Sequence, residues 1–151
     1  MTEKNPHAVL TDLFRAQRFA VLATEQAGAP YANLVAFAVT RDLKKILFAT
    51  PRMTRKYGNL QRNPQVALLI DSRANRAADL QAATAVTAVG RAAELVDAER
   101  QAFFSVYLAR HPSLLDFAHA PTTSLFCISV ARYVVVDHFQ HVVVLNVDQK
   151  L

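Results

Sequence analysis

Alternating and continuous runs of hydrophobic residues dominate the chain and predict a fold built mainly of β-strands. The clearest runs are FAVLAT at residues 19–24 and YANLVAFAVT at residues 31–40, with a turn containing Gly28 and Pro30 between them. Five further runs have the length and composition of strands, at residues 46–50, 66–71, 84–96, 125–136 and 142–147. Gly90 interrupts the third of these five and indicates a bulge or a close approach of two backbones.

Helical spacing of hydrophobic residues appears between some of these strands. It predicts helices over residues 7–16, 54–62 and 98–109, while residues 73–82 fit a loop or a helix and residues 112–121 a loop or a short helix. Asp97 is expected to cap the third helix, which ends at Arg110-His111-Pro112. Because strands and helices do not alternate regularly, we expect a six- to seven-stranded antiparallel barrel with helices outside, as one domain over residues 1–151.

The composition predicts a protein that buries part of its surface against a partner. Apolar residues make up 52% of the chain and charged residues only 19%, and an obligate homodimer would cover the excess. No run approaches the roughly 20 apolar residues of a membrane span, and residues 1–6 lack the apolar core of a signal peptide. Cys127 is the only cysteine, which excludes an internal disulfide and is typical of the reducing cytoplasm. We therefore expect a cytoplasmic homodimer without a membrane segment.

The charge pattern points to a small anionic ligand. The net charge is +5, but Lys and Arg are scattered and form no long basic tract, which argues against nucleic acid as a partner. The exception is ATPRMTRKYGNLQRNP at residues 49–64, which holds Arg52, Arg55, Lys56 and Arg62 without an acid. If Thr54 caps the helix, two of these cations occupy its first turn, where positive charge costs roughly 0.3–1 kcal/mol each. Either an anion lies against them, or the stretch is a solvated basic surface.

The order of motifs resembles the FMN-binding split-barrel family, which includes pyridoxamine 5'-phosphate oxidase. The resemblance runs from about Leu10 to Val136 and rests on VLAT, PYANLVAFAV, ILFATPRMTRKYGNLQRNPQVALLID and VGRAAEL, in that order. The resemblance implies that Arg55 and Lys56 hold the flavin phosphate, with the hydroxyls of Thr50 and Thr54 beside them. It also implies that residues Asn33, Leu34 and Val35 meet the polar edge of the flavin ring, and that the flavin lies at a homodimer interface.

The chain departs from the family where the oxidases bind their phosphorylated substrate. Tyr107 matches a substrate-binding Tyr, but Asn33, Ala38, His111 and Leu115 replace an Arg, a Lys, an Arg and a Ser. Outside the substrate site, Ala85 replaces a Gln that contacts the flavin in the family. A pocket without those cations disfavours a phosphorylated substrate. We therefore expect pyridoxamine 5'-phosphate and pyridoxine phosphate to be poor substrates, and a neutral or weakly polar molecule to be accepted instead.

The substrate-pocket candidates are Tyr107 and His111, and both have a structural alternative. Tyr107 fits a core position on its helix, and His111 fits a helix C-terminus, where a cation is favoured. His138 and His141 could form a metal or haem site, but no third ligand stands at metal-binding spacing, so we expect no metal.

The sequence contains no acid–base constellation, which is compatible with a flavin enzyme because the cofactor itself transfers the electrons. The resulting prediction is an FMN-dependent oxidoreductase that acts on a small molecule. The alternatives are a reductase that uses the deazaflavin F420, and a non-catalytic protein that binds flavin or haem.

Overall fold

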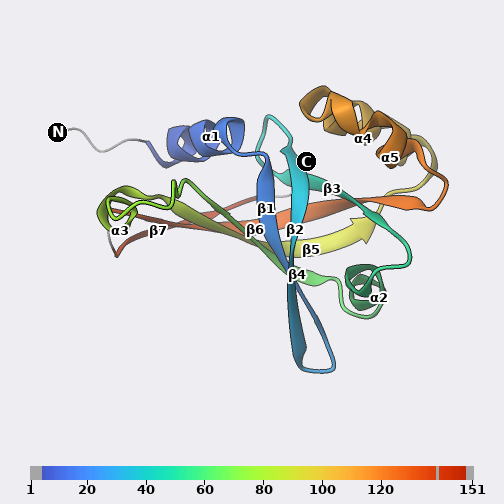
Figure 1. The fold of residues 1–151 in the computed structure, drawn as a ribbon, viewed down its shortest axis with the longest axis horizontal. Helices are drawn as coiled ribbons and strands as arrows, with labels where there is room; N and C mark the ends of the chain where they lie inside the picture. The colour runs from blue at the N-terminus through green and yellow to red at the C-terminus, as the bar shows by residue number, and fades with distance from the viewer. Residues whose placement is uncertain (1–4, 139, 149–151) are drawn as a thin grey trace.

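The computed structural model describes residues 5–138 and 140–148 (Figure 1). In chain order the elements are α1 (Pro6–Ala16), β1 (Phe19–Gln26), β2 (Ala29–Val39), β3 (Lys45–Pro51), α2 (Arg55–Arg62), β4 (Gln65–Asp71), α3 (Asp79–Ala82), β5 (Ala85–Glu94), α4 (Asp97–Arg110), the 3₁₀ turn η1 (Pro112–Leu114), α5 (Leu115–His119), β6 (Thr123–Asp137) and β7 (His141–Asn146). Within these parts of the chain, no helix has the length and hydropathy that crossing a membrane requires.

The seven strands form one antiparallel sheet in the order β3-β2-β1-β4-β5-β6-β7. The long strand β6 pairs with β5, and the part of it that contains Phe126 and Ile128 also pairs with β3. This second pairing closes the first six strands into a barrel, while β7 lies outside it along β6. The fold is therefore the antiparallel split barrel with peripheral helices that the sequence predicts.

Gly90 lies where β5 and β6 come unusually close. The register of the two strands shifts between Val89 and Gly90, which marks a bulge. A Cβ atom on Gly90 would lie only 2.2 Å from the carbonyl oxygen of Ser129. The predicted bulge and close backbone approach are both confirmed, and at this position only glycine fits without moving a strand.

Two hydrophobic clusters hold the elements together. The larger one fills the barrel and receives Leu10, Leu13 and Phe14 from α1, whose other side faces solvent. The smaller one lies between the barrel and α4, and includes Tyr107 and the buried Cys127. Figure 1 shows α1, α4 and α5 along one side of the barrel and α2 at the opposite end, beside the long β1–β2 hairpin.

Most predicted elements are confirmed with ends shifted by one or two residues, but one cap is wrong. The third long helix begins at Asp97 itself, because the amide of Arg100 donates to the carbonyl of Val96. Val96 therefore takes the cap position, where no side chain caps the helix. The β1–β2 turn is also shorter than predicted, since both strands extend to Gln26 and Ala29.

Candidate functional site

The site predicted from the basic stretch forms at the beginning of α2. Thr54 caps this helix as predicted, because its Oγ1 accepts a hydrogen bond of 3.3 Å from the amide of Tyr57. The hydroxyls of Thr50 and Thr54 lie 3.0 Å apart, and both are within hydrogen-bond distance of the carbonyl of Pro51. This set of bonds fixes the turn between β3 and α2, and it places Arg55 and Lys56 in the first helical turn.

Lys56 is the most informative residue of this turn. Its side chain is half-buried, and this burial lowers the pKa of its ammonium group. It forms no ion pair with a carboxylate of the described chain. A partly desolvated cation without a counter-ion, at a helix end that already carries partial positive charge, costs free energy that a bound anion would offset.

The neighbouring cations of the basic stretch have different environments. Arg55 is exposed and lies over the ring of Tyr31, with its Cζ 5.5 Å from the ring centre. This cation–π contact connects the beginning of α2 to β2. Arg52, in contrast, donates from Nε to Ser124 Oγ at 2.9 Å and lies 3.7 Å from Glu94. Arg52 thus stabilises the turn, whereas Arg55 and Lys56 are available to a ligand.

Two polar contacts hold α2 against β1. The buried Asn59 donates from Nδ2 to Thr24 Oγ1 at 3.0 Å, and Asn63 donates to Glu25 Oε2 at 2.6 Å. Both asparagines belong to the NLQRNP part of the motif. Their structural role is to keep the first turn of α2 beside the β1–β2 hairpin.

The second part of the predicted site lies on β2, two residues from Tyr31. Asn33 and Val35 share a face of the strand with Tyr31, and Val35 is buried in the barrel core. Asn33 Oδ1 is buried and has no hydrogen-bond partner within the described chain, although its Nδ2 donates to the carbonyl of Leu34 at 3.3 Å. An orphaned buried acceptor is rare in proteins and indicates a missing donor. The side chain of Leu34 points to the opposite face and is 65% exposed.

The structure therefore brings together the two groups of cofactor-binding candidates. Arg55 contacts Tyr31, and Tyr31 lies two residues before Asn33 on the same face of β2. Tyr31 itself was not among the predicted site residues. The available signal was its position at the start of the strand motif, but nothing in the sequence indicates which cation its ring meets.

Tyr107 and His111 lie behind β2, between the strand and α4. The hydroxyl of Tyr107 donates to the carbonyl of Ala36 at 3.2 Å, and its burial raises its pKa to about 12. His111 Nε2 lies 2.6 Å from the carbonyl of Phe37, which can only accept, so Nε2 carries the proton. Burial lowers the pKa of this imidazole, more than the hydrogen bond to Phe37 raises it. In the described chain both rings are buried and support β2, and direct contact of either with a substrate stays a prediction.

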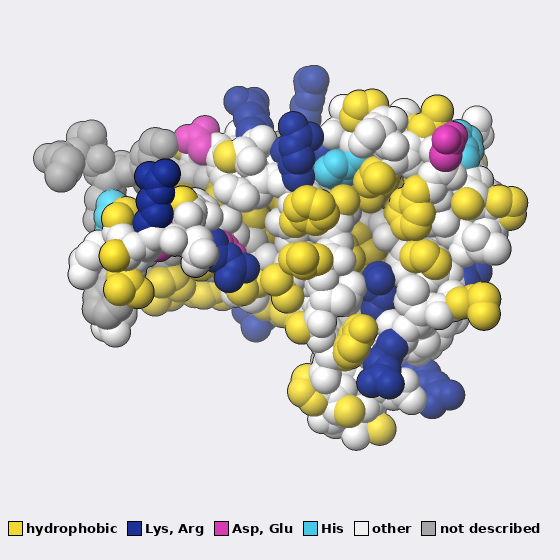
Figure 2. All heavy atoms as spheres, in the orientation of Figure 1, with side chains coloured by type: hydrophobic (Ala, Val, Ile, Leu, Met, Phe, Trp, Pro, Cys, Tyr) yellow, Lys and Arg dark blue, Asp and Glu magenta, His cyan; other side chains and the backbone are white. Residues whose placement is uncertain are grey.

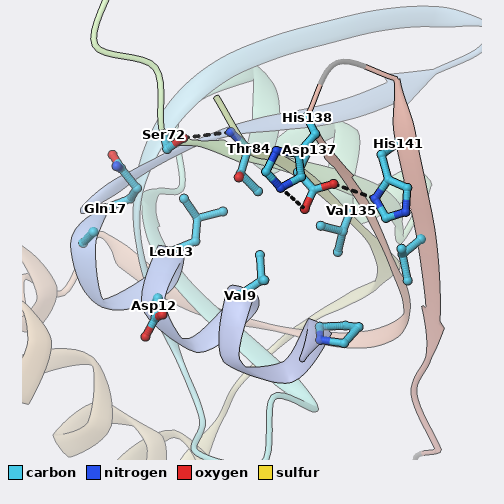
Figure 3. Close-up of a pocket in the computed structure, with 13 residues that line it drawn as sticks. Val9, Asp12, Leu13, Gln17, Ser72, Thr84, Val135, Asp137, His138 and His141 are labelled. Carbon is cyan, nitrogen blue, oxygen red and sulfur yellow. Dashed lines mark hydrogen bonds and ion pairs between the residues drawn. The ribbon is translucent and has the colours of Figure 1, made fainter. Parts of the chain in front are cut away.

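His138 and His141 line a separate cavity of about 610 Å³ between α1 and the β6–β7 hairpin (Figure 3). His141 Nδ1 donates to Asp137 Oδ1 at 2.7 Å, and His138 Nε2 lies 3.9 Å from Asp137 Oδ2. Within residues 5–138 and 140–148, no three His, Cys, Asp or Glu side chains are grouped so that they could hold a metal ion.

The fold and this arrangement define the class of small antiparallel split-barrel proteins. Residues 7–137 match the family model of pyridoxamine 5'-phosphate oxidase. The chain belongs to this family. No curated protein matches the sequence.

Solved structures share the fold at low sequence identity. A haem-binding protein from Mycobacterium smegmatis matches 96% of this chain with a TM-score of 0.82 and 18% identity, and the chain spans 60% of that protein. A FAD-binding protein from Mesorhizobium loti matches 87% of this chain and 92% of its own length, with a TM-score of 0.71 and 19% identity. A Clostridium acetobutylicum protein related to general stress protein 26, of the pyridoxinephosphate oxidase family, covers 95% of both chains, with a TM-score of 0.70 and 17% identity. At these identities the likeness shows a common fold.

Proposed function

We propose that this protein is an FMN-dependent oxidoreductase that acts on a small molecule, with the flavin phosphate held by Arg55 and Lys56. The observation that carries the proposal is Lys56, a half-buried cation in the capped first turn of α2 without a carboxylate partner in the described chain. A phosphate dianion would accept charge-assisted hydrogen bonds from the ammonium and the guanidinium, and would also face the free amides of the helix end.

The residues of β2 also fit a flavin. The polar edge of the flavin ring carries N–H and C=O groups, and an N–H donor there would satisfy the orphaned Oδ1 of Asn33. Thr50 and Thr54 would keep the phosphate end of the site in place through their contacts with Pro51. Family membership and the FAD-binding neighbour support a flavin as the cofactor class.

A bound flavin would supply the hydride or electron transfer, so the chain needs no acid–base pair of its own. The role of the protein is then to bind the phosphate, to orient the ring along β2 and to shape the substrate pocket. Asn33, Ala38, His111 and Leu115 stand where the oxidases of the family carry charged or hydroxyl groups, which favours a neutral or weakly polar substrate.

The proposal is tested by flavin binding to the purified protein. We expect a flavin absorption spectrum after purification, or saturable quenching of FMN fluorescence at one FMN per protomer. Competition with F420 and FAD identifies the preferred cofactor, and addition of haem tests the alternative that the haem-binding neighbour suggests. A colourless protein whose addition leaves FMN fluorescence unchanged would refute the proposal.

We also propose that the protein is a homodimer that joins through an apolar face of the barrel. Leu34, Val21 and Leu69 stand side by side across β2, β1 and β4, and Phe19 follows on the same face of β1. Leu34 is 65% exposed and Phe19 62%. Figure 2 shows hydrophobic side chains gathered over the middle of the molecule, where β1 and β2 run in Figure 1. An exposed apolar cluster of this kind is typical of a protein interface.

The dimer is tested by Leu34→Asp, which places a charge in the centre of that face. In analytical ultracentrifugation we expect the wild-type protein to have twice its 16.7 kDa protomer mass, and Leu34→Asp to have the mass of a monomer. Val96→Asp is the matched control, because Val96 is an exposed valine (60%) at the start of α4 and outside this face. A wild-type protein that is monomeric at micromolar concentration would contradict the dimer.

A further inference from the structure

A second groove, of about 640 Å³, lies on the side of the molecule where α1 and α4 meet the end of β2. This volume is in the range of small-molecule sites. The groove is lined by Thr11, Phe14 and Arg15 of α1, by residues 37–41 and Leu43 of β2 and the following turn, and by Val106 and Arg110 of α4. None of the residues proposed to bind flavin lines it, and of the positions named for the substrate pocket only Ala38 does.

Three arginines from three different elements line this groove. They are Arg15 on α1, Arg41 in the β2–β3 turn and Arg110 on α4, and no Asp or Glu of the described chain lines it with them. Figure 2 shows Lys and Arg side chains projecting along the upper edge of the molecule, between the positions that α1 and α4 take in Figure 1. The arginines reach one groove from sites that are far apart in the sequence, so the tertiary fold creates this concentration of charge.

Arg110 is held in place by the end of α1. Its Nη2 donates to the carbonyls of Arg15 and Gln17, both at 2.9 Å. Carbonyls at a helix C-terminus favour a cation, and they orient the guanidinium without removing its charge. Arg15 and Arg41 are exposed, so their guanidinium groups are accessible to a ligand.

The two acids nearest in sequence do not line the groove. Asp42, next to Arg41, accepts hydrogen bonds from Thr40 Oγ1 at 2.6 Å and from the amide of Lys44 at 3.0 Å, so its carboxylate is used within its own turn. Asp12, on α1, lines the cavity on the other side of that helix, where Figure 3 shows it. The helix α1 therefore separates the cavity that Asp12 lines from the groove with the three arginines.

The charges of Arg110 and Arg18 also act on the buried imidazole of His111. Burial is the main reason why the pKa of His111 is lowered, and the charges of Arg110 and Arg18 lower it further.

We propose that this groove is a second ligand site, which binds a small molecule through a diphosphate or triphosphate group. Guanidinium groups form bidentate, charge-assisted hydrogen bonds with phosphate oxygens, and adjacent phosphates present enough closely spaced charge to meet several arginines. The volume of the groove, about 640 Å³, and its position among three elements favour a compact ligand over an extended nucleic acid.

The test measures binding of inorganic pyrophosphate to the wild-type protein and to Arg15→Gln/Arg41→Gln by calorimetry. Loss of two charged hydrogen-bond donors is expected to weaken pyrophosphate binding by roughly tenfold or more. Arg110 is left unchanged because it supports α1. The matched control is Arg91→Gln/Arg132→Gln, which removes two exposed strand arginines that do not line the groove and changes the net charge equally.

The proposal predicts that the control binds pyrophosphate like the wild type, and that FMN binding is the same in both double variants. Equal weakening in both variants would show attraction to net charge only and would overturn the proposal. So would the absence of pyrophosphate binding, citrate binding as tight as pyrophosphate, or a single-stranded oligonucleotide that displaces pyrophosphate from the arginines. A loss of FMN binding in Arg15→Gln/Arg41→Gln would assign the groove to the flavin and likewise overturn a separate site.

Discussion

Replacing Arg55 and Lys56 together with alanine should weaken FMN binding by about 3–5 kcal/mol, which is roughly a hundredfold to several thousandfold. The reason is that a phosphate would lose two charge-assisted partners, one of them the half-buried Lys56. Arg55 is exposed and contributes the smaller share, because solvent screens its charge. Fluorescence titration with FMN measures the effect directly.

The same variant separates a binding role from a structural one. Two cations in the first turn oppose the helix dipole, so their removal should leave the unliganded protein as stable as the wild type or slightly more stable. The control Arg91→Ala/Arg132→Ala removes the same net charge elsewhere and should retain the wild-type affinity. If Arg55→Ala/Lys56→Ala bound FMN with unchanged affinity, the assignment of the phosphate to α2 would be wrong.

The substitution Gly90→Ala should destabilise the protein by about 3 kcal/mol or more. The new methyl group would lie 2.2 Å from the carbonyl oxygen of Ser129, a backbone atom that cannot rotate away. The two strands would have to separate at the bulge between Val89 and Gly90, where β5 pairs with the strand that closes the barrel. Urea denaturation followed by circular dichroism measures the loss.

Gly58→Ala is the matched control for this prediction. Gly58 lies within α2, and apart from its chain neighbours and the backbone of its own helix no atom lies within 4 Å of the position that its Cβ would take. Alanine is favoured over glycine in a helix by up to about 1 kcal/mol, so this variant should be neutral or stabilised. A free energy of unfolding for Gly90→Ala within about 1 kcal/mol of the wild type would show that the strands tolerate the added methyl group.

Local patterns in the sequence were enough to predict the elements of the fold. Each strand run is apolar or alternating, and Thr54 carries a side chain that caps α2 as expected. The Asp97 cap was wrong because the chain stays bonded to the barrel for one residue beyond the end of β5. Leu95 still donates to Leu125 of β6, and the first helical hydrogen bond then starts one residue early, at Val96.

The candidate site was predictable only in part, because some of its contacts join residues that are far apart in the sequence. The basic stretch and its cap are local, so Arg55 and Lys56 could be proposed from neighbouring residues alone. The contact between Arg55 and Tyr31 joins two segments more than twenty residues apart, and the orphaned Oδ1 of Asn33 depends on what covers it. The spacing of hydrophobic residues along the chain does not predict such contacts.

The sequence by itself determined the strands, the capped basic helix, the position of the Gly90 bulge and the resemblance to a flavin-binding family. The tertiary structure alone decided that β3 pairs with β6 to close the barrel, that Tyr107 and His111 lie buried behind β2, and that Arg15, Arg41 and Arg110 line one groove. The physical reason is that helix caps and hydrophobic periods depend on residues a few positions apart, whereas burial and the concentration of charge depend on segments brought together by packing.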